Sequence, residues 1–271
     1  MSENNHKPSF RGALMELRAP LEALTLIPTL PFLKYSPKGE FQPVLVLPGF
    51  LATDNSTHVL RRYLNKQNFR AFPWELGRAP GLQDVIYKKL EKRVIALHEE
   101  FGQKVSIVGW SLGGLYARTL AHKIPDHVRQ VVTVASPFGA SQMKTSEKVQ
   151  VSGPILRLYE RLNPDLDTDK LLQGVPVWEM PPPVPSTSIY SESDGIASWH
   201  YCIDPVGVQT ENLRVSGSHT GMTHNPVVLY AIAERLSQLE NDWQPFESKT
   251  IHRVLFPKPC CASDLIARAV H

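Results

Sequence analysis

A short glycine–serine motif, GWSLG at residues 109–113, limits the possible folds of this chain more than any other feature. An apolar, β-branched run precedes it at 104–108, and a run with helical spacing follows at 112–123. A strand that passes through G-x-S-x-G into a helix is typical of a nucleophile elbow, where a sharp turn raises the serine above a sheet. Glycines suit the motif because a Cβ would crowd the neighbouring strand and helix. We therefore predict a nucleophile at Ser111; the alternative is an ordinary glycine-rich turn.

Strand-like and helix-like segments alternate along most of the chain. The strand-like segments are 42–47, 69–74, 104–108, 128–135, 187–190 and 212–216. The helix-like segments are 56–67, 82–101, 112–123 and 226–239. This alternation predicts an α/β protein with a mostly parallel, doubly wound sheet flanked by helices. We expect Ser56 and Asn225 to cap helices, Pro226 to be a first helical residue, and Gly102 to follow a helix end.

Composition divides the 271 residues into three parts. Residues 1–40 are a Pro-rich N-terminal lead-in, 41–246 form the predicted α/β domain, and 247–271 read as a C-terminal tail. Inside the domain, residues 137–185 interrupt the alternation, and they contain three aspartates and the run PPPVP. Insertions of this length between strands often cover active sites, so we predict a lid-like insertion; the alternative is a structural excursion without substrate contact.

A serine nucleophile needs a histidine base and a carboxylate that orients it. In sheet hydrolases the chain order is Ser, then Asp or Glu, then His. Asp194 and His219 follow the strand-like segments 187–190 and 212–216, so both are expected at the carboxyl edge of the sheet. We predict these two residues as the acid and the base. The remaining candidates are Glu192, Asp204, Asp165, Asp167 and Asp169 for the acid and His224 and His200 for the base.

Two backbone N–H groups are expected to bind the oxyanion, one after the nucleophile and one after the first strand. Leu112 supplies the first, and Phe50 supplies the second, with Leu51 as the near alternative. Trp110 and Leu51 are also candidates for lining the substrate pocket, although core packing would explain Trp110 equally well.

Composition argues against several other classes of function. A net charge of +3, with scattered basic residues, does not favour nucleic-acid binding. Ten histidines occur without a recognisable metal-ligand spacing, so we expect no metal site. Three cysteines, Cys202, Cys260 and Cys261, give no disulfide framework, which favours a reducing, cytoplasmic location. The oligomeric state is not predictable.

The apolar run at 19–33 contains Glu22, Pro28 and Pro31 and is too short for a transmembrane helix. We expect it to pack on the domain. The alternative is a flap that contacts substrate or a membrane or lipid surface.

Four motifs together resemble the α/β-hydrolase family, in particular its bacterial esterase/lipase-like members. They are VLPGF at 46–50, GWSLGG at 109–114, YSESDGI at 190–196 and GSHTGM at 217–222. The likeness covers about residues 19–246 and implies hydrolysis of esters or amides without a metal or an organic cofactor. One departure concerns the oxyanion loop, because many relatives have His-Gly where this chain has Pro48-Gly49.

The motifs and the resemblance together predict a serine hydrolase that cleaves carboxylic esters, small or lipid-like, through an acyl-enzyme on Ser111. A thioesterase or an amidase of the same fold is an alternative. A second class is a non-catalytic module that uses the fold to bind a ligand or partner, since a fold alone does not fix function.

Overall fold

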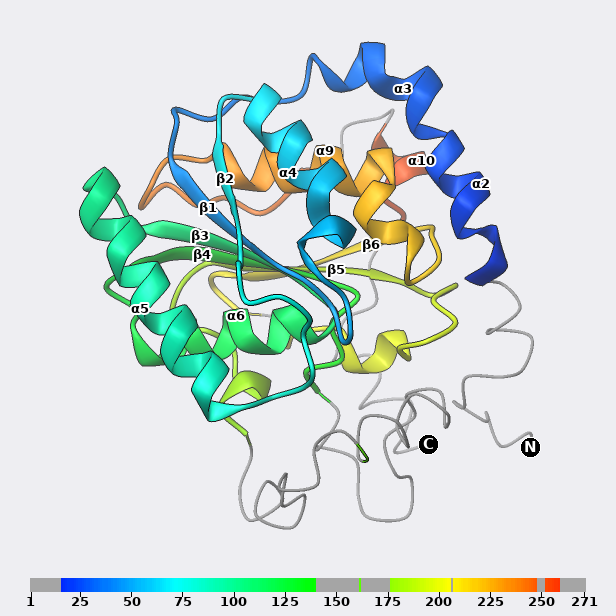
Figure 1. Ribbon diagram of the computed structural model, residues 1–271. Helices are drawn as coiled ribbons and strands as arrows, with labels where there is room; N and C mark the ends of the chain where they lie inside the picture. The colour runs from blue at the N-terminus through cyan, green and yellow to red at the C-terminus, as the bar shows by residue number, and fades with distance from the viewer. Residues whose placement is uncertain (1–15, 140–160, 162–175, 206, 248–251, 259–271) are drawn as a thin grey trace.

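A six-stranded, fully parallel sheet forms the centre of the molecule (Figure 1). The computed structural model describes residues 16–139, 161, 176–205, 207–247 and 252–258. The strands are β1 (Pro43–Leu47), β2 (Arg70–Pro73), β3 (Val105–Trp110), β4 (Val128–Val134), β5 (Ser186–Ser191) and β6 (Thr210–Val215). Their order across the sheet is β2-β1-β3-β4-β5-β6. The predicted α/β class with a parallel sheet is confirmed.

Helices cover both faces of this sheet (Figure 1). One face carries α5 (Asp84–Phe101) and α6 (Leu112–Lys123), and the other carries α4 (His58–Lys66) and α9 (Pro226–Leu236). Side chains of β1 alternate between the two cores: Val44 and Val46 pack toward α4 and α9, whereas Leu45 and Leu47 pack toward α5 and α6. Because both faces are covered, every residue of β1 is buried, which explains its continuous apolar sequence.

Helix ends agree with the expectations in two of three places. Gly102 follows α5 with φ 61°, and Asn225 Oδ1 accepts the N–H of Val227 at 2.9 Å, with Pro226 as the first residue of α9. The expected cap at Ser56 is wrong. The chain first forms a 3₁₀ turn, η2 (Asp54–Thr57), in which the Ser56 hydroxyl donates to the carbonyl of Thr53 at 2.8 Å. The helix α4 therefore begins two residues later.

The N-terminal lead-in contains helices that pack on the domain. These are η1 (Glu16–Arg18), α2 (Ala19–Leu24) and α3 (Leu26–Leu33). Leu33 is buried and Leu26 packs against the core on the α9 side of the sheet, as Figure 1 shows for α3. Other large apolar side chains of this segment point to solvent. Among the described residues, no helix has the length and apolarity needed to cross a bilayer.

Most of the predicted insertion at 137–185 lies outside the described residues, and so do Asp165, Asp167 and Asp169. The described ends of the insertion converge on Arg118 of α6. The guanidinium stacks over the ring of Phe138 at 3.7 Å from its centroid, and it donates to the carbonyls of Trp178, in η4 (Val177–Glu179), and Met180. It also forms a fully buried ion pair with Asp204 at 2.8 Å.

Two further 3₁₀ turns, η5 (Trp199–Tyr201) and η6 (Gly221–His224), follow the loops after β5 and β6. In the predicted tail, α10 (His252–Leu255) leads to Phe256, which is buried against Phe246 with 4.7 Å between ring centroids. Cys260 and Cys261 lie outside the described residues.

Candidate active site

Ser111 occupies the sharp turn between β3 and α6. Its backbone has φ 53° and ψ −119°, a conformation that residues other than glycine rarely adopt. The turn is fixed by the N–H of Ser111, which donates to the carbonyl of Val134 at 2.8 Å. The side chain is thereby presented at the carboxyl edge of the sheet, directly before the N-terminal turn of α6.

Close backbone packing explains the glycines of the motif. A Cβ added to Gly109 would lie 2.4 Å from backbone atoms of Gly113 and Gly114, and one added to Gly113 would lie 2.5 Å from the carbonyl oxygen of Leu47. Contacts this short cannot be relieved by rotating a side chain, because the opposing atoms belong to the backbone. The glycines therefore allow the strand and the helix to approach closely enough to form the turn.

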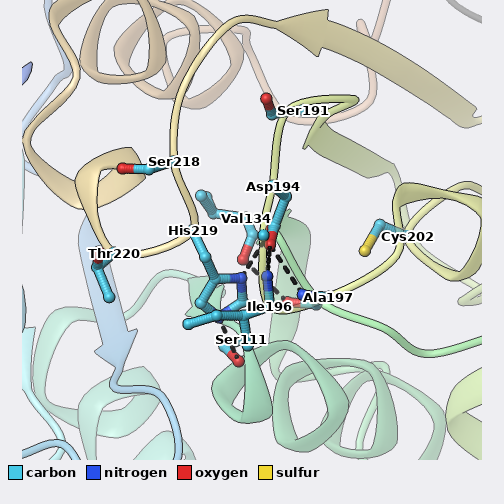
Figure 2. Close-up of polar contacts among 12 residues, drawn as sticks. Ser111, Val134, Ser191, Asp194, Ile196, Ala197, Cys202, Ser218, His219 and Thr220 are labelled. Atoms are coloured by element: carbon cyan, nitrogen blue, oxygen red, sulfur yellow. Dashed lines mark hydrogen bonds and ion pairs between the residues drawn. The ribbon is translucent and has the colours of Figure 1, made fainter. Parts of the chain in front are cut away.

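The loops after β5 and β6 bring Asp194 and His219 to Ser111. Figure 2 shows the imidazole of His219 between the serine and the aspartate. His219 Nε2 lies 3.0 Å from Ser111 Oγ, and Nδ1 lies 2.7 Å from Asp194 Oδ2. Asp194 Oδ1 accepts the N–H groups of Ile196 and Ala197, both at 2.8 Å. The second oxygen of the carboxylate is thus aimed at the histidine, and the three predicted side chains form one connected line.

The electrostatic environment favours the protonated form of His219. Burial alone would lower the pKa of this imidazole, but the charge and hydrogen bond of Asp194 and the charge of Glu16 together raise its pKa above the usual 6.5. A base in this setting has increased affinity for a proton arriving from Ser111.

The predicted oxyanion residues also lie beside the serine. A Cβ on Gly49 would be 3.2 Å from Ser111 Cβ, so the loop after β1 reaches the nucleophile. In that loop the N–H of Leu51, the near alternative, donates to the carbonyl of Ala79 at 2.7 Å, so this N–H is engaged within the protein. Leu112 is the first residue of α6, where backbone N–H groups have no partner within the helix.

Trp110 lies beneath the histidine loop. Its indole N–H donates to the carbonyl of His219 at 3.1 Å, and the two rings are 5.7 Å apart between centroids. The side chain also packs against the core on the α9 side of the sheet. These contacts favour a supporting role for Trp110 over the predicted lining of a pocket.

The other candidate acids and bases that the structure describes are engaged elsewhere. Glu192 forms an ion pair with Arg214 at 2.7 Å, and Asp204 is the buried partner of Arg118. The ring of His200 stacks on Trp199. His224 Nδ1 lies 2.9 Å from the hydroxyl of Thr223, and burial lowers the pKa of His224. Among these candidates, the structure joins only Asp194 and His219 to Ser111.

Sequence reasoning did not find three polar residues of the N-terminal segment that reach the site. Glu16 and Glu22 accept hydrogen bonds from the loop that carries His219, and Arg18 donates to the carbonyl of Ser193 at 2.9 Å. No motif or spacing in the chain links them to residues about 200 positions away.

A sequence profile of the alpha/beta hydrolase fold matches residues 94–165, which include Ser111 and the helix that follows it. The fold also matches that of Aspergillus fumigatus lipase B with a TM-score of 0.52 and 16% identity, over 74% of this chain and 54% of the lipase. The profile match, the parallel sheet and the turn at Ser111 all indicate the same fold. The chain is an α/β-hydrolase-fold protein.

Curated proteins similar to this α/β-hydrolase-fold chain include phosphatidylcholine-sterol acyltransferases. The protein of Micromys minutus is 25% identical over 239 residues, which is 76% of this chain and 74% of the relative. The human protein is 28% identical over 100 residues, which is 35% of this chain and 23% of the relative. This α/β-hydrolase-fold protein is thus similar to acyltransferases in sequence and to a lipase in fold, and its match to the human relative spans less than a quarter of that protein.

Proposed function

We propose that this α/β-hydrolase is a serine hydrolase that cleaves carboxylic esters through an acyl-enzyme. The observation that carries the proposal is the line of hydrogen bonds from Ser111 through His219 to Asp194, at 3.0 and 2.7 Å. A serine hydroxyl becomes an effective nucleophile when a histidine held in this way removes its proton.

In the proposed reaction, Ser111 Oγ attacks the ester carbonyl while its proton passes to His219 Nε2. The carbonyl electrons move to the oxygen, and the N–H groups of Phe50 and Leu112 stabilise that oxyanion. The tetrahedral intermediate then expels the alcohol, which takes the proton from His219. Water repeats the sequence on the acyl-enzyme and releases the carboxylic acid. Asp194 keeps the imidazole in the productive orientation and stabilises its cationic form.

Acyl transfer to an alcohol is a second candidate, favoured by the similarity to phosphatidylcholine-sterol acyltransferases. The first half of the reaction would be the same, and an alcohol would replace water as the acceptor in the second half. Adding a primary alcohol to the ester assay separates the two: a transferase forms the new ester in preference to the free acid.

Covalent labelling with a fluorophosphonate tests the proposal directly. We expect one adduct on the wild-type protein and none on Ser111→Ala in intact-mass spectra, because the probe requires an activated serine. Peptide mapping should place the adduct on Ser111. A folded wild-type protein without an adduct would argue for the binding-module alternative.

A further inference from the structure

Glu16 joins the two loops that carry Asp194 and His219. Its Oε1 accepts the N–H of Gly195 at 2.9 Å and the N–H of His219 at 2.8 Å. Its Oε2 accepts the N–H and the hydroxyl of Thr220, at 3.1 and 2.9 Å. One carboxylate from the N-terminal segment thus holds the residue after Asp194 together with His219 itself.

Two neighbours of Glu16 extend this connection. Glu22 accepts the N–H of Ser218 at 3.0 Å and its hydroxyl at 2.5 Å. Arg18 donates to the carbonyl of Ser193 at 2.9 Å and pairs with Glu22 at 2.7 Å. Ser193 precedes Asp194 and Ser218 precedes His219, so the segment contacts both loops next to the side chains that react.

The charges near His219 make the contribution of Glu16 measurable. Burial alone would raise the pKa of Glu16, but hydrogen bonds from His219, Gly195 and Thr220 lower it, so Glu16 is anionic when the histidine titrates. The negative charges of Asp194 and Glu16 raise the pKa of His219. Glu22 binds Ser218, the residue before His219, and its charge is paired with that of Arg18.

We propose that Glu16 is a positioning residue that holds the acid loop and the histidine loop together and supplies a second negative charge beside the base. This proposal rests on the proposed function, because Glu16 would act by maintaining the geometry of Ser111, His219 and Asp194. A helix at the start of the chain thereby becomes part of the active-site architecture.

Glu16→Gln is expected to lower kcat/KM for a short ester about 10- to 100-fold, since small displacements of reacting groups have effects of this size. An amide nitrogen would replace one of two oxygens that both accept from N–H donors, which forces the loops apart. The loss of negative charge also lowers the pKa of His219. The base must be neutral, and activity rises as pH passes through that pKa, so the acidic limb of the pH profile should move to lower pH.

Two variants and one independent measurement make the test decisive. Glu99→Gln removes an equivalent charge from the exposed side of α5. It should change neither kcat/KM nor the pKa of His219. Glu16→Asp keeps the charge but is one methylene shorter, so it should lose activity while retaining more of the raised pKa of His219. NMR titration of the His219 ring reads this pKa without ester turnover, and thermal melts establish folding.

A folded Glu16→Gln protein that matches Glu99→Gln in both the His219 titration and kcat/KM would overturn the proposal. An inactive wild-type protein would contradict the proposed function instead. The titration would still show whether Glu16 acts on the histidine.

A different observation concerns the outer side of the same N-terminal segment. Half of the exposed large hydrophobic side chains among the described residues fall between positions 17 and 35, namely Leu17, Leu21, Leu24, Ile27, Leu30, Phe32 and Tyr35. Their exposed fractions range from 50% to 79%. A concentration of exposed apolar side chains in one segment is typical of an interaction site.

The charges of the segment indicate the kind of partner. Between residues 17 and 38 the only acidic side chain is Glu22, which is turned toward Ser218 and paired with Arg18. Lys34 and Lys38 are exposed at the end of the apolar run, and one exposed acidic residue, Glu40, follows them. Anionic lipid headgroups would neutralise the charges of these lysines.

We infer that the apolar outer side of residues 17–35 docks on an anionic lipid surface, with the lysines at the headgroups. Amphipathic segments bind in this way by placing apolar side chains at the boundary between headgroups and acyl chains. Because α2 contacts η6, which follows His219, the docked surface would lie beside the proposed active site.

Co-sedimentation with phosphatidylcholine vesicles containing phosphatidylglycerol tests this inference. We expect the wild-type protein to bind, and Leu21→Asp combined with Ile27→Asp to weaken binding at least about tenfold, since each substitution removes an aliphatic side chain that the lipid would otherwise bury. Val208→Asp is the matched control: Val208 is 94% exposed and precedes the first residue of β6, whereas η6, which α2 contacts, follows the carboxyl end of that strand.

Absence of wild-type binding would overturn the lipid inference, and so would an equal loss in the Val208 variant. Self-association of the wild-type protein without lipid, abolished by the double substitution, would assign the face to a second copy instead. Each of these measurements is independent of ester hydrolysis.

Discussion

Replacing Ser111 with alanine is expected to lower kcat for short p-nitrophenyl esters by about 10⁴- to 10⁶-fold, as removal of the nucleophile does in other serine hydrolases. The oxygen that would form the acyl-enzyme is lost, while the backbone donors remain. Steady-state kinetics with active-site titration should show the loss in kcat, because alanine leaves the binding surface nearly unchanged.

Ser237→Ala is a suitable control, since its hydroxyl only donates to the carbonyl of Glu234 at the end of α9. It should keep wild-type kinetics. Full esterase activity in folded Ser111→Ala would contradict the proposed mechanism outright, because no other residue at the elbow could form the intermediate.

Asp194→Asn should lower kcat by about 10⁴-fold with little change in stability. The carbonyl oxygen of asparagine can still accept from Ile196 and Ala197, which directs its amide group toward His219 Nδ1. An amide donor there selects the tautomer with the proton on Nε2, and this tautomer cannot accept the proton of Ser111. The pH-rate profile and the melting temperature distinguish this effect from unfolding.

Glu192→Gln provides the comparison, because Glu192 was the nearest candidate acid in sequence and pairs with Arg214 at the surface. We expect its kcat within about twofold of wild type, in line with the small contribution of exposed ion pairs. A loss equal to that of Asp194→Asn would transfer the role of the acid to Glu192.

The parts of the site that could be predicted are those that local patterns fix. Ser111 follows from a strand–turn–helix motif, and Asp194 and His219 follow from positions just after strands of one parallel sheet. Parallel strands place their carboxyl ends on one edge, so residues far apart in sequence could be expected together.

Glu16 could not be predicted because no local pattern records its partners. Three of its four hydrogen bonds come from backbone N–H groups, which every residue except proline possesses. The hydrogen bond with His219 spans 203 positions of the chain. The sequence therefore gives no reason to assign a role in the site to Glu16 or Glu22. The wrong cap at Ser56 has a different cause: the hydroxyl has competing partners, and here it donates to the carbonyl of Thr53 instead of accepting from the helix.

The buried Arg118 has a consequence for how such a protein can diversify. Arg118 belongs to α6 and contacts Phe138 at one end of the interval between β4 and β5, and Trp178 and Met180 at the other end. Both described ends of the interval are thus attached to one side chain of α6, and this attachment does not involve the residues between them. A design that exchanges this interval must therefore keep Arg118 and its buried partner Asp204.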